Sequence, residues 1–405
     1  MRLNYNFKLT DMILFKKLMS LAIIMIASIN TQAQQNKVVI EGVLEDNTQM
    51  TIPYVAVSIP TKNIGTTSTE EGRFYLSLKQ NNLQDTLVIS SMGFKTFKIK
   101  VEDYLHQKNK TIVLEDDVSE LENVVIKSAK EYIYEVLKQR KKTFVSDSHQ
   151  LDFIYRRSDV EQDVSKFFVE HYMSIVYKGP KSYVSRMQVN EARKSADYRI
   201  AGKPQGGHSG LYMFNINPLN DYFTPIKKME WKKIGDTTYD GESVLILEGT
   251  KENLKRVGKP LITVLYIGMD TNNIYRIECS SGNQVYQYVK NSEGKMYLSY
   301  HKREYYSRRE ISARHQKALK LKTPQISIGI RHEALVLGIK TDKKQFTAKG
   351  YDQHDKEMGN VKLRYNPTFW DNLSLPPDTA FYKKIKAELE SNYGVPLETQ
   401  FNLVN

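Results

Sequence analysis

The sequence predicts a mainly β protein in which an N-terminal β-sandwich precedes a helix and a long, curved antiparallel sheet. Residues 37–114 contain short β-branched runs with turn residues between them, a pattern typical of a β-sandwich. Residues 151–306 contain longer alternating runs joined by turns, which predicts an antiparallel meander. The 405 residues suffice for two or three domains, each with its own core.

The N-terminal residues 1–33 are expected to form a secretory signal peptide. Lys16 and Lys17 precede a short apolar run that ends near Ala33, and this order of charge, apolar core and small residue is typical of export signals. The run is shorter than the roughly 20 apolar residues that span a bilayer. We therefore expect an exported protein, periplasmic or associated with the outer membrane, without a transmembrane segment in its mature form. Met12 is a better-placed initiator than Met1.

The single cysteine, Cys279, limits the chemistry of the chain. It excludes an intramolecular disulfide and a cysteine-rich zinc site. It also lies far from the signal, so lipid attachment to a cysteine behind the signal is excluded. We expect Cys279 to be a small buried hydrophobic residue of a strand.

Seven strands are expected in the sandwich, residues 34–116. They are predicted at 37–44, 56–60, 66–68, 73–78, 86–90, 95–100 and 110–114. Gly72 lies where a tight hairpin requires a positive φ.

Several segments of this region are characteristic: Ile40-Glu-Gly-Val43, Pro53-Tyr-Val-Ala-Val57, Gly65-Thr66, Glu71-Gly-Arg-Phe74, residues 85–94 and Ile112-Val-Leu114. Together they resemble the carboxypeptidase-regulatory-like domain of Bacteroidetes envelope proteins. The resemblance implies a prealbumin-like sandwich without catalytic residues of its own. The apolar residues 121–126 resemble the segment that often follows this module, and residues 117–128 are interpreted as a linker.

The second domain, residues 129–405, is predicted to begin with a helix at 129–145. Ile133, Val136 and Leu137 share one face of this helix, as in an amphipathic helix. A basic cluster at its C-terminal end complements the helix dipole. This cluster either contacts anionic lipid or glycan, or is a solvated helix end.

The long strands of the second domain are expected at 151–159, 166–177, 183–190, 242–250, 260–269, 274–280, 285–289 and 295–306. A helix followed by such a meander is similar in pattern to the half-barrel of periplasmic lipoprotein carriers, although no motif supports the likeness. The chain is predicted to end with an extended strap at 364–377 that buries Trp370, and with a helix at 379–392.

A long irregular segment, residues 192–230, interrupts the meander. It contains seven glycines or prolines and the aromatic residues Tyr212, Phe214, Tyr222 and Phe223. Long loops in compact domains are often functional, so these four residues are candidate ligand contacts. The segment either covers the mouth of the half-barrel or packs on its own aromatic residues.

The net charge of +13 belongs to residues 129–405, since the sandwich region has more acidic than basic side chains. Arg303, Arg308 and Arg309 are interleaved with tyrosines in residues 297–309, at and just beyond the last predicted strand. Such a strand can bind nucleic acid, but export disfavours that partner. The candidate partners are therefore lipopolysaccharide phosphates or an acidic glycan, and the alternative is a solvated, tyrosine-rich strand.

No complete catalytic motif is present. His301 and Glu304 have the spacing of a zinc pair, but residues three apart in a strand point to opposite faces. His208 precedes Ser209, but Leu211 replaces the last glycine of a Gly-x-Ser-x-Gly elbow. We therefore expect no metal, no cofactor and no catalysis.

The leading hypothesis is an exported, non-enzymatic envelope protein. In it, an interaction module is joined to a β domain that binds an apolar or anionic ligand on its concave face. One alternative is a periplasmic lipid or lipoprotein carrier. The other alternative is a peptide or glycan hydrolase whose site lies in residues 192–230.

Overall fold

A computed structural model describes residues 37–117, 127–202, 214, 217–220, 226–252, 260–350, 357–373 and 375–404. The expected signal peptide and the apolar segment 121–126 lie outside these residues. So do Tyr212, Tyr222 and Phe223. Among the described residues, no helix is long and apolar enough to cross a membrane.

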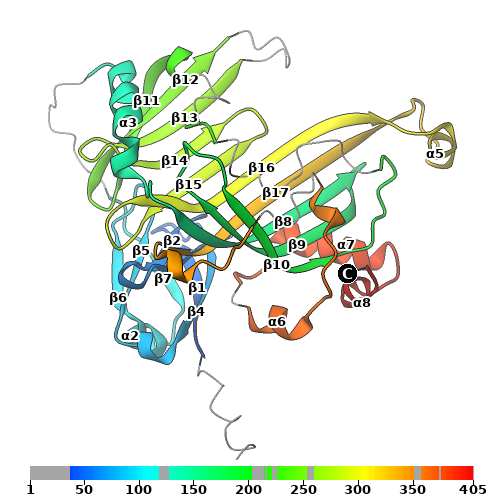
Figure 1. Cartoon of the computed structure of the whole chain (residues 1–405), viewed down its shortest axis with the longest axis horizontal. Helices are drawn as coiled ribbons and strands as arrows, with labels where there is room; N and C mark the ends of the chain where they lie inside the picture. The colour runs from blue at the N-terminus through cyan, green and yellow to red at the C-terminus, as the bar shows by residue number, and fades with distance from the viewer. Residues whose placement is uncertain are drawn as a thin grey trace, which may run out of the picture.

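The N-terminal domain is a β-sandwich of two sheets (Figure 1). One sheet has the order β4-β1-β7, and the other has the order β3-β2-β5-β6. The strands are β1 (Lys37–Glu45), β2 (Ala56–Ile59), β3 (Ile64–Thr67), β4 (Arg73–Lys79), β5 (Thr86–Ser90), β6 (Phe97–Lys100) and β7 (Thr111–Val113). The seven predicted strands are confirmed. The short helix α2 (Val101–His106) was not predicted.

Two glycines show why the sandwich closes as it does. Gly72 has a φ of 69°, which confirms the predicted turn. Gly42 lies beneath Tyr104, whose hydroxyl donates to the carbonyl of Glu41 at 2.8 Å. A Cβ on Gly42 would lie 2.4 Å from that hydroxyl, so only glycine allows the tyrosine to reach the strand.

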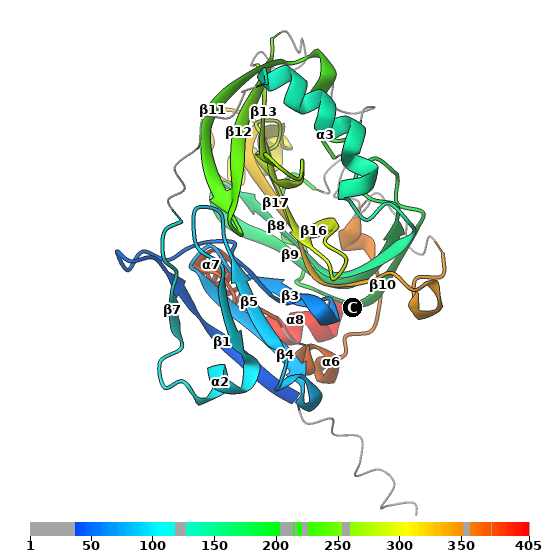
Figure 2. The ribbon, with the colours of Figure 1, turned by 90° about the vertical axis from the view of Figure 1, so that its left-hand side faces the viewer.

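The second domain is a curled sheet of half-barrel shape (Figure 2). Its spatial order is β11-β12-β13-β14-β15-β16-β17-β8-β9-β10. The strands are β8 (His149–Glu161), β9 (Val164–Tyr177), β10 (Arg186–Lys194), β11 (Glu230–Tyr239), β12 (Glu242–Lys251), β13 (Leu261–Gly268), β14 (Ile274–Cys279), β15 (Gln284–Lys290), β16 (Met296–Glu310) and β17 (Gln325–Lys340). One pair of residues, Gly338 and Ile64, joins β17 to β3 and makes a continuous 14-stranded sheet.

Helix α3 (Ala129–Thr143) lies on the concave side of the sheet (Figure 2). Ser128 and Glu131 form a capping box at its start. The predicted face of Ile133, Val136 and Leu137 is buried among the inward side chains of the strands. The concave face is thus occupied by a packed apolar core.

The outer face of β8 and β9 is covered by the C-terminal helices (Figure 1). These are α6 (Pro367–Asn372), α7 (Ala380–Ser391) and α8 (Leu397–Val404). Trp370 is buried, as predicted. The prediction of an extended strap was wrong for α6, because Asn366 caps this helix and Pro367 occupies its first turn.

Candidate binding cleft

A cavity of about 360 Å³ lies between the sandwich and the outer face of the meander. The meander contributes Tyr239, Ile246, Tyr266, Arg276 and Gln287, one from each of five neighbouring strands. Because successive side chains of a strand point to opposite faces, sequence neighbours such as Leu245, Leu265 and Ile277 belong to the concave core instead. The sandwich contributes Tyr54, Ser90, Met92 and Phe94, among others.

Tyrosine rings dominate the walls of this cleft. The rings of Tyr239 and Tyr275 lie 4.3 Å apart, and Tyr54, Tyr266 and Tyr288 also line the cavity. Burial raises the pKa of Tyr239 and of Tyr275, and burial with the nearby Glu278 carboxylate raises that of Tyr266. These hydroxyls therefore remain protonated at neutral pH. The hydroxyl of Tyr275 donates to Glu242 at 2.6 Å, and that of Tyr266 donates to Glu278 at 3.4 Å, so their oxygens remain as acceptors.

The polar groups of the cleft are placed among these rings. The Nε atom of Arg276 lies 2.7 Å from Glu278 Oε1, so this pair is neutral as a unit. Gln287 is 9% exposed, and its Nε2 donates to the carbonyl of Tyr54 at 3.2 Å. Its Oε1 has no hydrogen-bond partner in the part of the chain that the structure describes. A buried acceptor without a partner in the protein is costly, which points to a ligand donor.

Contacts between the two domains fix the width of the cleft. At one rim, the amide of Gly93 donates to the carbonyl of Thr238 at 2.8 Å, and Thr96 donates to Asp240 at 2.8 Å. The cleft is thus formed before a ligand arrives, which lowers the entropy cost of binding.

Tyr54 has a strained backbone at this junction. Its φ of 59° lies in the left-handed region, which residues other than glycine rarely adopt. Its ring packs on Tyr300, and its hydroxyl donates to Glu70. Strain of this kind persists where surrounding contacts hold it, often at binding sites.

Those sequence-predicted site residues that the structure describes do not line this cleft. Phe214 is buried in the concave core, with its ring 4.8 Å from Phe153. Arg303, Arg308 and Arg309 follow one another along β16, beyond its pairing with β15. Of the described candidates, the structure therefore places Phe214 in the core and the arginines on a projecting hairpin.

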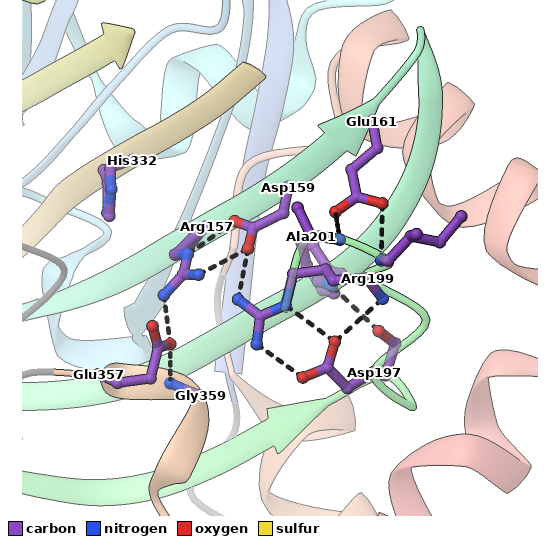
Figure 3. A network of polar contacts seen from close by, with 12 residues as sticks. Arg157, Asp159, Glu161, Asp197, Arg199, Ala201, His332, Glu357 and Gly359 are labelled. Atoms are coloured by element: carbon purple, nitrogen blue, oxygen red, sulfur yellow. Dashed lines mark hydrogen bonds and ion pairs between the residues drawn. The ribbon is translucent and has the colours of Figure 1, made fainter. Parts of the chain in front are cut away.

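A second polar cluster is a structural clamp (Figure 3). The Nη2 atom of buried Arg157 lies 2.6 Å from Asp159 Oδ2, and Arg157 also pairs with Glu357. Arg199 approaches the same Asp159 oxygen at 2.6 Å. Burial alone would raise the pKa of Asp159, but the two guanidinium groups lower it. The charges offset one another, and the pairs tie Arg199 and Glu357 to β8.

The remaining candidate groups are structural as well. Cys279 is buried, as predicted, and burial raises the pKa of its thiol to about 12. The Nδ1 atom of His301 donates to the carbonyl of Val285, while Glu304 pairs with Arg331. Among the described residues, no group of three or more potential ligands could hold a metal ion.

Comparison with protein families identifies the type of domain to which the N-terminal sandwich is similar. Residues 40–126 match the family model of the CarboxypepD_reg-like domain, a β-sandwich class. This confirms the resemblance for the sandwich. No curated protein matches the chain.

Similar solved structures include three bacterial proteins. One is an outer membrane lipoprotein-sorting protein domain from Vibrio parahaemolyticus, 9% identical, with a TM-score of 0.27 over 56% of this chain and 97% of that chain. A LolA superfamily protein from Nitrosomonas europaea is 15% identical, with a TM-score of 0.21 over 55% and 98%. A lipoprotein from Mycobacterium tuberculosis is 8% identical, with a TM-score of 0.21 over 55% and 98%. TM-scores this low carry no argument about function.

Proposed function

We propose that this chain is an exported, non-enzymatic binding protein of the cell envelope that holds a glycan in the cleft between its domains. The observation that carries the proposal is a preformed, tyrosine-lined cavity of about 360 Å³ with an unpartnered acceptor on Gln287. Cavities of roughly 300–1,000 Å³ are typical of small-ligand sites.

The walls of the cleft favour a glycan over an extended peptide. A peptide strand binds by pairing with the free edge of a sheet, but the meander side of this cleft consists largely of outer-face side chains from β11 to β15. Tyrosine rings offer flat apolar surfaces with a polar tip, which suit sugar rings. Arg276 and Gln287 then supply a donor and an acceptor for sugar hydroxyls.

The protonation states of the side chains in the cleft favour binding without catalysis. Hydrolysis needs a poised acid and base near the scissile bond. The perturbed groups of this cleft are tyrosines that retain their protons, and Glu278 is paired with Arg276. The hydrolase alternative depends on His208 and Ser209, which lie outside the described residues, and it stays a hypothesis.

The cleft is tested by calorimetric titration with muropeptides and lipopolysaccharide core oligosaccharides. We expect Tyr266→Ala and Gln287→Ala to weaken binding of the recognised glycan at least tenfold, since each removes a wall contact. Tyr134→Ala, on the exposed side of α3, is the matched control. Unchanged affinity in both cleft variants would overturn the proposal.

Export is tested separately on cells that express the full chain. We expect the protein in the periplasmic or outer-membrane fraction, with its N-terminus near Gln34. An uncleaved N-terminus in the cytosolic fraction would contradict export and leave the cleft assignment to be judged by titration.

Lipid carriage is a second candidate, favoured by the apolar concave face beneath α3. Movement of α3 away from the strands would expose that face to a lipid chain. We expect a carrier to copurify with lipid in near-stoichiometric amount, measured by extraction and mass spectrometry. A lipid-free extract from protein purified without detergent would contradict this candidate.

A further inference from the structure

The β16–β17 hairpin extends as an arm from the sheet (Figure 1). Pairing of β15 with β16 ends at Lys302, whereas β16 and β17 remain paired to Glu310 and Gln325. On the other side of the hairpin, β17 stays paired with β8 as far as Ile328, which lies opposite Ser307. The projecting arm therefore consists of residues 308–327. The short helix α5 (Ala313–Ala318) lies at its end.

The end of the arm is strongly basic. Residues 306–325 contain six lysines or arginines and a single acidic residue, Glu310, for a formal charge of +5. Five of these cations are exposed and form no ion pair with any residue that the structure describes: Arg308, Arg314, Lys317, Lys320 and Lys322. Their charge is therefore not used within the described fold.

One of these cations, Lys320, occupies a backbone position that usually belongs to glycine. The amides of Lys320 and Leu321 donate to the carbonyls of Lys317 and Gln316, at 3.2 and 3.1 Å. This is the Schellman ending of a helix, in which the left-handed position is usually glycine. Lys320 occupies that position with a φ of 52°, so its backbone is strained.

The tip of the arm, residues 311–324, is held by hydrogen bonds within the same segment. Within the described residues, the hydrogen bonds of residues 311–324 connect positions of the same segment, from Ile311 with Pro324 to Leu319 with His315. Leu319 is 40% exposed between the cations. An exposed apolar residue among lysines and arginines is typical of surfaces that enter a membrane interface.

We propose that this arm docks the protein on a bilayer surface that contains anionic phospholipid. The positive tip complements the phosphate plane, and cations near such a surface add to one another. Because the arm projects, a flat bilayer can meet the tip while the cleft remains open. This docking surface is separate from the proposed glycan site, so each assignment can fail without the other.

The first test is sedimentation of the mature chain with vesicles of phosphatidylcholine, with or without phosphatidylglycerol. We expect binding only to the anionic vesicles, and at least a tenfold loss when the salt rises from about 0.1 M to about 0.5 M. Equal binding to both kinds of vesicle would overturn the proposal.

The second test separates the tip from the overall charge. We expect the triple variant Lys317→Gln, Lys320→Gln, Lys322→Gln to lose at least tenfold in binding to anionic vesicles. The matched control is Lys98→Gln, Lys100→Gln, Lys108→Gln, which removes the same charge from exposed positions of the sandwich. A similar loss in both triples would show a net-charge effect and contradict docking through the arm.

A single variant distinguishes docking from folding. Lys320→Gly removes a cation and relieves the left-handed strain, so we expect an equal or higher melting temperature together with roughly fivefold weaker vesicle binding. Undiminished vesicle binding by this variant would contradict a role for Lys320 in docking.

Discussion

The guanidinium of Arg331 lies 2.8 Å from the carboxylate of Glu70, and this ion pair joins the meander to the sandwich. The same carboxylate accepts from the hydroxyl of Tyr54 and lies 3.5 Å from Lys302. The Glu70 side chain of the sandwich thus interacts with side chains of both domains beside the cleft.

The contribution of this junction is tested by Glu70→Gln. We expect the free energy of unfolding to fall by about 1–2 kcal/mol, because Arg331 and Lys302 lose a charged partner while Glu333 still compensates Arg331. Urea denaturation measures the change. Glu115→Gln removes an exposed pair with Lys95 and is expected to cost little. Equal effects of the two variants would contradict a joining role for Glu70.

The same carboxylate predicts a pH dependence. Burial alone would raise the pKa of Glu70, but the hydrogen bonds from Tyr54 and Arg331 lower it below its usual value near 4.5. A lowered pKa in the folded state stabilises above the unfolded pKa and is lost as the pH falls through the folded pKa. We therefore expect the difference between parent and Glu70→Gln, measured by urea denaturation, to shrink below about pH 4.5.

Buried histidines predict a second loss of stability in acid, in a higher pH window. Burial lowers the pKa of His171 and of His301 to about 3, from 6.5. Between these values the unfolded chain binds more protons than the folded chain. The free energy of unfolding therefore decreases as the pH decreases, by up to about 1.4 kcal/mol per pH unit for each histidine. His171→Gln is expected to flatten the slope between pH 6.5 and 4.5. An unchanged slope in this variant would contradict the assignment.

Phe214 is predicted to stabilise the core. Its ring packs between Phe153 and Tyr177, so Phe214→Ala should lower the free energy of unfolding by about 3–5 kcal/mol. Chemical denaturation measures this. A change below about 1 kcal/mol would instead agree with a side chain available to a ligand.

Arg157 is predicted to be essential to the polar clamp. Arg157→Met leaves the carboxylates of Asp159 and Glu357 partly uncompensated in a buried site, and we expect a cost of about 3–5 kcal/mol. The double variant Arg157→Met, Asp159→Leu should recover part of this cost, because it removes one of the stranded charges. The absence of recovery would show that packing of the arginine stem, and not its charge, dominates.

Local alternation predicted the sandwich strands but missed β11 and β17. Along β11, Lys232, Lys233 and Asp236 interrupt the apolar pattern at the edge of the sheet. The second half of β17 is apolar at successive positions because it is covered on both faces, by the core and by the C-terminal helices. A strand buried on both sides loses the period of two on which the prediction depends.

The cleft was not predictable because its partners are distant in sequence. Tyr54 meets Tyr300, and Gln287 bonds the backbone of Tyr54. Nothing local distinguishes these residues from other half-buried strand positions. Phe214 is an aromatic residue of a glycine-rich loop and was therefore predicted to contact a ligand, but tertiary packing places it in the core.

The backbone pairing of Gly338 with Ile64 has a consequence for fragments that contain only the sandwich. A fragment that ends near residue 126 would retain the family-matched region but would uncover β3 as an edge strand, together with the face of the sandwich opposite the meander. Exposed edges of this kind promote intermolecular strand pairing. The two domains therefore behave as one hydrogen-bonded body, and binding studies need the intact chain.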